Sequence, residues 1–255
     1  MSDPLTRFSN RTDNYVKFRP SYPVGLIEIL TEDCGLSETS IIADVGSGTG
    51  ILSKMFLQNG NSVLAIEPNA AMRGAAESLL RDYAKFKSID ATAEATTLRS
   101  ESVDFVTAAQ AFHWFDRTRA KCEFARITKP AGWVVLIWNE RRLDSTAFLR
   151  AYEDLLLRYG TDYEKVRHEN VASEIAGFFA PQSFKSQTLE NVQHFDLESL
   201  KGRLLSSSYA PNQDHPNFAS MLKELERIFA ANQQNGIVDF EYETKVYYGR
   251  LRGLA

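Results

Sequence analysis

The chain has 255 residues, of which 44% are hydrophobic and 24% are charged, and its formal net charge is −4. This composition is that of a globular protein large enough for one α/β domain with an attached lobe around a single core. No run of five or more Lys or Arg residues occurs, which disfavours nucleic acid or an anionic membrane as a partner.

The sequence carries no membrane or metal signal. Its first residues lack the apolar core of a signal peptide, and the longest apolar run, 133–138, is too short to cross a bilayer. Cys34 and Cys122 stand at no metal-ligand spacing, so we expect two buried, reduced thiols and no metal. We therefore expect a cytoplasmic protein that is either a monomer or a homodimer.

The first part of the chain alternates predicted helices and strands. A helix is expected from Val24 to near Gly35, where glycine ends it. Strands are then expected at about 41–45, 62–66, 85–89, 103–108 and 133–138, with helices at about 51–59, 70–82 and 117–128. This alternation predicts a parallel sheet with helices on both faces.

The second part of the chain mixes strands with longer helical segments. Residues 184–195 and 240–251 alternate in the manner of strands, and helices are expected at 145–159, 197–207 and from Pro216 to near Gly236. Because these helices interrupt the sheet after its fifth and sixth strands, we expect a lid over the carboxyl ends of the strands, where open α/β sheets bind ligands. Alternatively, the apolar faces of these helices only pack into the core, and the helices do not form a lid.

A glycine-rich loop follows the first predicted strand. Residues 44–50 read Asp-Val-Gly-Ser-Gly-Thr-Gly, at a point where a strand turns into a helix. Glycine permits the turn and lets the backbone approach a nucleotide cofactor closely. A carboxylate at Asp44 disfavours a pyrophosphate on the helix N-terminus, and Ile51 stands where a dinucleotide fingerprint has its third glycine. A ligand with an ammonium and a sulfonium fits this loop better.

An acidic residue follows the loop at the spacing expected for a ribose-binding carboxylate. Glu67 stands seventeen residues past Gly50, at the end of the second predicted strand, where a carboxylate accepts both hydroxyls of an adenosine ribose. With this residue the chain resembles the class I S-adenosylmethionine-dependent methyltransferases, most closely their type 11 small-molecule branch. The segments that carry the resemblance are 44–50, 67–72, 92–94, 103–106 and 110–115. Residues 15–23, Tyr-Val-Lys-Phe-Arg-Pro-Ser-Tyr-Pro, are similar to a segment of trans-aconitate-methyltransferase-like proteins.

The resemblance implies a doubly wound, seven-stranded, mostly parallel sheet whose antiparallel seventh strand lies between strands five and six. Residues 1–140 would form the cofactor-binding part, with a capping segment at 1–23, and residues 141–255 the helical lid plus strands six and seven of the same domain. It implies S-adenosylmethionine as cofactor, with S-adenosylhomocysteine as product. The cofactor-binding residues would be Tyr15, Arg19, Asp44, Gly46, Ser47, Gly48, Thr49, Gly50, Glu67, Pro68, Met72, Ala93, Glu94, Gln110, Ala111 and Phe112.

The sequence signals for the residues that bind the methyl acceptor are less specific than those for the cofactor. His113 follows the fourth strand, where it is a general base, a donor to substrate, or a packing residue that holds the loop. The expected substrate-binding residues are Tyr22, His113, Trp114, Trp138, Asn139, Ser208 and Tyr209. For the tryptophans, core packing is an equal alternative. For Ser208 and Tyr209 the alternative is the end of a helix.

The predicted reaction is methyl transfer to an oxygen, nitrogen or carbon atom of a small organic molecule, carboxylates included. Alignment and exclusion of water supply much of the rate of such a displacement, so no dedicated nucleophile is needed. The alternatives are a nucleic-acid or protein methyltransferase, or a non-catalytic S-adenosylmethionine-binding protein of the same fold. Residues 110–113, Gln-Ala-Phe-His, lack the Asn/Asp-Pro-Pro-Tyr/Phe signature of base amino-group methylation.

Overall fold

The computed structural model describes residues 17–163 and 171–251, and within these ranges seven strands form one sheet. The strands are β1 (Ile41–Val45), β2 (Ser62–Ile66), β3 (Phe86–Ile89), β4 (Val103–Ala109), β5 (Thr128–Arg141), β6 (Phe184–Phe195) and β7 (Val238–Gly249). Their order is β3-β2-β1-β4-β5-β7-β6, and β7 runs antiparallel to both of its neighbours while the other pairs are parallel. The predicted fold class is confirmed.

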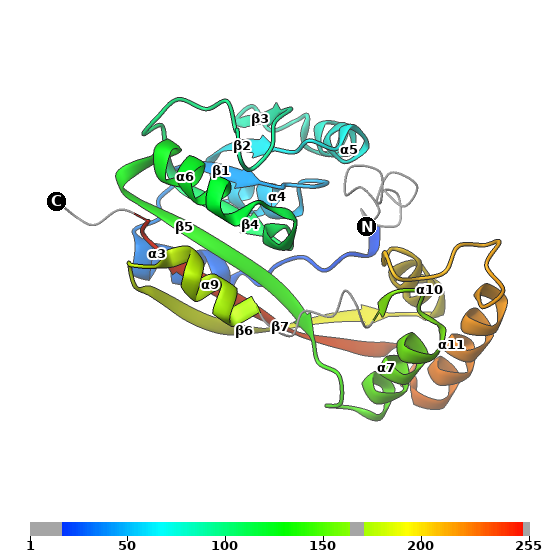
Figure 1. The fold of residues 1–255 in the computed structure, drawn as a ribbon. Helices are drawn as coiled ribbons and strands as arrows, with labels where there is room; N and C mark the ends of the chain where they lie inside the picture. Colours follow the sequence, from blue (N-terminus) through cyan, green and yellow to red (C-terminus); the bar gives the residue numbers. More distant parts are fainter. Residues whose placement is uncertain (1–16, 164–170, 252–255) are drawn as a thin grey trace.

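Helices cover both faces of this sheet (Figure 1). The first face is covered by α3 (Gly25–Cys34), α4 (Ile51–Gln58) and α5 (Ala70–Leu80), whose buried residues include Leu30, Phe56 and Leu80. On the opposite face, α6 (Arg117–Ile127) and α9 (Val171–Phe179) bury Phe124 and Phe179. Residues that alternate along each strand therefore enter two separate cores, which accounts for the apolar character of the parallel strands.

Side-chain caps set where several helices begin. Asn69 accepts hydrogen bonds from the backbone amides of the first turn of α5, and Asp116 does the same for α6. Each cap satisfies amides that have no partner inside the helix. The predicted end of the first helix at Gly35 is confirmed, because this residue adopts φ 72° after the last turn of α3.

Three helices form a separate layer beyond the carboxyl end of β5 (Figure 1). This helical layer consists of α7 (Ala147–Tyr159), α10 (Leu197–Leu205) and α11 (Phe218–Asn232). It has its own core, in which Leu149, Leu200 and Leu225 pack with Phe240 from the start of β7. The chain thus leaves the sheet at the two predicted places and returns along two long strands, β6 and β7.

Two elements differ from the sequence-based expectation. Helix α9 was not predicted; it is short, and only one of its nine residues, Glu174, is charged. Strand β5 begins at Thr128 instead of 133, since Val103 pairs with Thr128 and Phe105 with Trp133, so an irregularity takes up the residues between.

The structure also tests the expectations about the two cysteines and about membrane-spanning helices. Cys34 is partly buried, and burial raises the pKa of its thiol to about 12, whereas Cys122 is exposed on α6. The expectation of two buried thiols is therefore wrong for Cys122, which lies on the solvent side of its helix. Within the ranges 17–163 and 171–251, no helix is long and apolar enough to cross a bilayer.

Candidate active site

The glycine loop lies at the carboxyl end of β1 and leads into α4. Gly46, Gly48 and Gly50 adopt φ values of 67°, 57° and 83°, a region that favours glycine. A Cβ on Gly46 would lie 2.5 Å from the Cβ of Ala111, whereas one on Gly48 would meet nothing within 4 Å. The loop after β4 therefore packs directly on Gly46, and the backbone at Gly48 is open to a ligand.

Asp44 lies beneath this loop and is 1% exposed. Its carboxylate accepts hydrogen bonds from Ser53 Oγ at 2.6 Å and from Thr107 Oγ1 at 3.1 Å. Burial raises the pKa of Asp44 to about 6, and the nearby charge of Glu67 also raises it. The hydrogen bonds from the Ser53 and Thr107 hydroxyls lower this pKa, but by less. A cationic ligand group would favour the ionised form, so this carboxylate is placed to respond to one.

Glu67 ties the glycine loop to the end of β2. Its side chain accepts from the Gly48 amide at 2.9 Å and from the Asn69 amide at 2.8 Å, one at each oxygen. Burial raises the pKa of this carboxyl, although both amides lower it. Each carboxylate oxygen has a further lone pair that can accept from a ligand hydroxyl.

Two hydroxyls of the loop are available to a ligand. Ser47 Oγ and Thr49 Oγ1 are buried and have no hydrogen-bond partner in the structure. Both lie on the wall of a cavity of about 30 Å³, which Tyr22 covers from the N-terminal segment. Buried polar groups are normally satisfied, so these two hydroxyls are free to bind a ligand group in the loop. The residues present fit a nucleoside-containing cofactor.

The residues expected around the adenine come from two neighbouring loops. Pro68 follows Glu67 directly, and Met72, 4% exposed, lies in the first turn of α5. Ala93 is buried in the loop after β3, and the next residue, Glu94, accepts from the amide of Asp116 at 2.9 Å. The Glu94 carboxylate therefore holds the start of α6 against this loop.

The loop after β4 is held in a constrained conformation. Gln110 adopts φ 56°, and its side chain donates to the carbonyl of Asn139 at 2.9 Å. A short 3₁₀ helix, η2 (Phe112–Trp114), follows. Phe112 is 1% exposed, and its ring packs edge-on against that of Phe178 in the core. A non-glycine residue at positive φ is typical of functional loops.

The candidate acceptor residues fall into different environments. His113 is half-buried with its ring 4.7 Å from that of Trp114, which is 37% exposed. Trp138 is 2% exposed and packs edge-on against Phe112 in the core, so its position matches the packing alternative. Asn139 lies at the rim, where its amide donates to the carbonyl of Ser21 at 3.2 Å.

A second group of predicted residues meets under the helical layer, away from the glycine loop. Arg19 donates to the carbonyl of Ser206 at 3.0 Å, at the end of α10. Ser208 and Tyr209 follow in the same turn and are half-buried, and the ring of Tyr209 lies 4.9 Å from that of Tyr163. Tyr15 lies outside the described residues.

Sequence reasoning missed the charged residues of this second group. Arg141 lies at the end of β5 and Arg203 within α10, and both are buried. Two signals could have found them. Arg141 shares a strand face with Asn139 two residues earlier, and Arg203 stands beside Leu200 and Leu204 on an apolar helix face.

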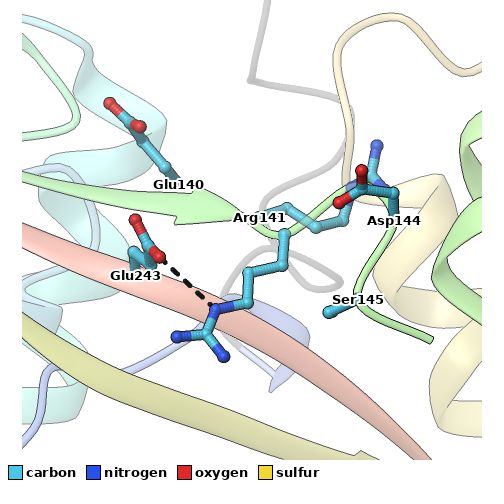
Figure 2. A pocket seen from close by; sticks show the side chains of 6 residues that line it. Glu140, Arg141, Asp144, Ser145 and Glu243 are labelled. Atoms are coloured by element: carbon cyan, nitrogen blue, oxygen red, sulfur yellow. Dashed lines mark ion pairs between the residues drawn. The ribbon is translucent and has the colours of Figure 1, made fainter.

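A larger cavity, of about 370 Å³, opens at the end of β5 (Figure 2). It is lined by Glu140, Arg141, Arg142, Asp144, Ser145 and Glu243. Arg142 lies 3.5 Å from Glu243 and 3.8 Å from Glu241, so its charge is already paired. Three carboxylates, those of Glu140, Asp144 and Glu243, and two guanidinium groups, those of Arg141 and Arg142, therefore line this cavity.

Comparison with known proteins identifies relatives. Residues 43–136 match a family model described as a methyltransferase domain. An uncharacterized methyltransferase from Geobacillus kaustophilus is 30% identical over 169 residues, which are 63% of this chain and 77% of that protein. One from Schizosaccharomyces pombe is 28% identical over 253 residues, 94% of this chain and 95% of the relative. With a second S. pombe methyltransferase-like protein, 33% identical over 162 residues, the match covers 62% of this chain and 60% of the relative.

Solved structures share the fold. A structure described as a putative type II methyltransferase from Anaeromyxobacter dehalogenans superposes with a TM-score of 0.69 at 23% identity, covering 92% of this chain and 99% of that one. Phosphoethanolamine N-methyltransferase 2 from Haemonchus contortus, in complex with S-adenosyl-L-methionine, gives 0.55 at 12% identity, covering 96% and 56%.

Proposed function

This chain belongs to the class I S-adenosylmethionine-dependent methyltransferases, and we propose that it methylates a small organic molecule. The observation that supports the cofactor site is the glycine loop, in which Ser47 and Thr49 present buried hydroxyls without partners between Asp44 and Glu67. When bound, the cofactor supplies a methyl group on a positively charged sulfur. A closer relation to the trans-aconitate-methyltransferase-like branch is part of the proposal and rests on residues 15–23.

The cofactor would be held by residues at the carboxyl ends of β1, β2 and β4. Glu67 would accept the ribose hydroxyls with its remaining lone pairs, and Asp44 would face the ammonium group. Met72, Pro68, Ala93 and Glu94 would border the adenine. The backbone of 110–112 would lie against the sulfur side, since Ala111 packs on Gly46.

The acceptor would approach from the rim formed by Gln110 and Asn139. His113 and Trp114, from η2, and Tyr22, from the N-terminal segment, would border this rim. These side chains would orient the acceptor and exclude water, and His113 would take a proton where the acceptor must lose one. A cytoplasmic location and a monomeric or homodimeric state stay predictions from the sequence.

Calorimetric titration and a transfer assay test the proposal together. We expect S-adenosylhomocysteine to bind and NADH not to bind. We also expect label from methyl-labelled S-adenosylmethionine to enter a compound in a deproteinised cell extract. Binding without transfer to any small molecule would contradict the acceptor class but leave the cofactor site standing.

The pH dependence of cofactor binding tests Asp44. Its carboxyl in the empty protein has a pKa of about 6, so it is ionised above that pH and protonated below it. Because only the ionised form attracts an ammonium group, affinity for S-adenosylhomocysteine should fall as pH is lowered from 7 to 5. Asp44→Asn should bind more weakly at pH 7 and lose this dependence. Since Glu67 is present in both proteins, equal slopes would contradict the role of Asp44.

Hydrogen exchange tests whether the N-terminal segment closes over the cofactor. Tyr22 covers a cavity of only about 30 Å³ beside the glycine loop, so this segment should rearrange when a nucleoside binds. We expect the amides of 17–22 and of α10 to gain protection with saturating S-adenosylhomocysteine. The central strand β4 should not change. Unchanged exchange at 17–22 would show that the segment is not a lid.

A further inference from the structure

Two buried arginines lie close together between the helical layer and β7. Arg141 has 9% of its side chain exposed, and Arg203 is 5% exposed. Their guanidinium carbons lie 5.9 Å and 5.5 Å from the centre of the same ring, that of Phe240. Two like charges are therefore held against one aromatic side chain, with little exposure to water.

Among the described residues, one carboxylate pairs with these two cations. Arg141 pairs with Glu153, which also accepts from Tyr163 OH at 2.6 Å. Arg203 donates only to neutral groups, Tyr242 OH at 3.1 Å and Ser207 Oγ at 2.9 Å. In the described ranges no carboxylate pairs with Arg203. A buried charge without a counter-ion is costly, so the cluster carries an excess positive charge that an anion would neutralise.

Two donors in the cluster are unused. Arg141 Nη1 and Tyr152 OH are buried and have no hydrogen-bond partner in the structure. The guanidinium of Arg141 lies 5.2 Å from the centre of the Tyr152 ring, so the two donors belong to one site. Tyr152 is 1% exposed, so bulk water does not take the place of the missing partner. Unused buried donors next to excess positive charge point to an oxyanion.

Tyr209 reports the same electrostatic field. Burial by itself raises the pKa of its phenol, but Arg203, a hydrogen bond with Ser207, and the charges of Arg19 and Arg141 together lower it below its ordinary value. Three guanidinium groups thus act on one buried hydroxyl. The field of this pocket favours negative charge despite the loss of solvent.

The cluster continues directly from the proposed acceptor rim. Arg141 lies two residues beyond Asn139 on β5, and side chains at that spacing share a face about 7 Å apart. Across the strand pair, Asn139 is opposite Thr244 and Arg141 is opposite Tyr242. A molecule that contacts Asn139 with one end can therefore reach Arg141 with the other.

We propose that Arg141, Arg203 and Tyr152 bind the anionic group of the methyl acceptor, which is a small organic oxyanion methylated at an atom a few bonds from that group. This inference rests on the proposed function, because it names the chemical class of its substrate. The anchored oxygens are occupied by guanidinium and phenol donors, which withdraw their electron density. Methyl transfer therefore takes place at the other end of the acceptor, near Gln110 and Asn139.

Charge fractionation of the acceptor pool tests the class of substrate. A deproteinised cell extract is separated at pH 7 on ion-exchange resins into anionic, neutral and cationic fractions, and each is incubated with enzyme and methyl-labelled S-adenosylmethionine. We expect label only in the anionic fraction. Phosphatase treatment of that fraction then separates phosphate esters, which would lose activity, from carboxylates. Label confined to the neutral or cationic fraction would overturn the inference and leave the proposed function intact. Label in no fraction would overturn both.

Tyr152→Phe separates ligand binding from folding, with Tyr163→Phe as its matched control. The Tyr152 hydroxyl has no protein partner, so its removal should not lower the melting temperature, yet KM for the active fraction should rise about tenfold. The Tyr163 hydroxyl is bonded to Glu153, so its loss should lower the melting temperature. Arg203→Met should raise KM at least tenfold with unchanged affinity for S-adenosylhomocysteine. If Tyr152→Phe leaves KM unchanged, the cluster does not hold the acceptor.

Discussion

His113→Ala is expected to lower kcat by about 10²–10⁴-fold for an acceptor that must lose a proton, with little change in cofactor affinity. The residue lies in η2, directly after the Gln110–Ala111 turn that packs on the glycine loop. In the proposed arrangement, a base at this place would reach an acceptor atom at the rim. Single-turnover rates of both proteins between pH 5.5 and 9 measure the effect on transfer itself.

The nature of the acceptor atom changes the outcome for this variant. A carboxylate oxygen needs no base, so only positioning would be lost and the effect would appear mainly in KM. Trp114→Ala is the matched control, because it removes the ring that lies 4.7 Å from that of His113 without removing the imidazole. If His113→Ala transfers at the wild-type rate throughout this pH range to a protonated nucleophile, then His113 is a packing residue.

Glu67→Ala is expected to weaken binding of S-adenosylhomocysteine at least tenfold. Each charge-assisted hydrogen bond to a ribose hydroxyl contributes roughly 1.5–3 kcal/mol, and this carboxylate is placed to accept two. The substitution also removes the acceptor for the amides of Gly48 and Asn69, so a lower melting temperature should accompany the loss. Isothermal titration and thermal unfolding measure the two effects separately.

Two further variants separate binding from stability at this position. Glu67→Gln keeps the size of the side chain and one acceptor oxygen, so it should lose affinity while staying closer to wild type in stability. Asp90→Ala removes an exposed carboxylate that pairs with Arg73 at 2.9 Å, and it should bind normally. Unchanged affinity of Glu67→Ala would refute the ribose assignment.

Local sequence patterns were sufficient for the sheet and for the glycine loop. Parallel strands alternate with helices because each buried strand needs a crossover, and this alternation is visible in residues 41–138. Gly46, Gly48 and Gly50 adopt left-handed conformations that favour glycine, so the three glycines indicate the turn in the sequence. The same patterns were insufficient for α9, which is short and has one charged residue, Glu174, and for the start of β5, which depends on its register with β4.

The side chains under the helical layer illustrate why part of the site was hidden. Tyr209 and Arg19 were predicted as separate binding residues, but Arg141, Arg203 and Tyr152 were not predicted at all. These residues come from the N-terminal segment, β5, α7, α10 and the turn after α10, and no local pattern relates them. Trp138 is the opposite case. Its place near the end of a strand suggested a pocket residue, but in the structure its ring packs against Phe112 and Tyr247.

The sequence by itself determined the family, the cofactor loop and the strand order that the family implies, because these depend on backbone conformation and on spacing along a continuous stretch of chain. Only the tertiary structure decided which charges are buried together. Burial and electrostatic interaction depend on distance in space. In the sequence, α7, α9 and β6 lie between Arg141 and the helix that carries Arg203, yet both side chains contact Phe240. The glycine loop was therefore predictable from the sequence, whereas the proposed anion site required the fold.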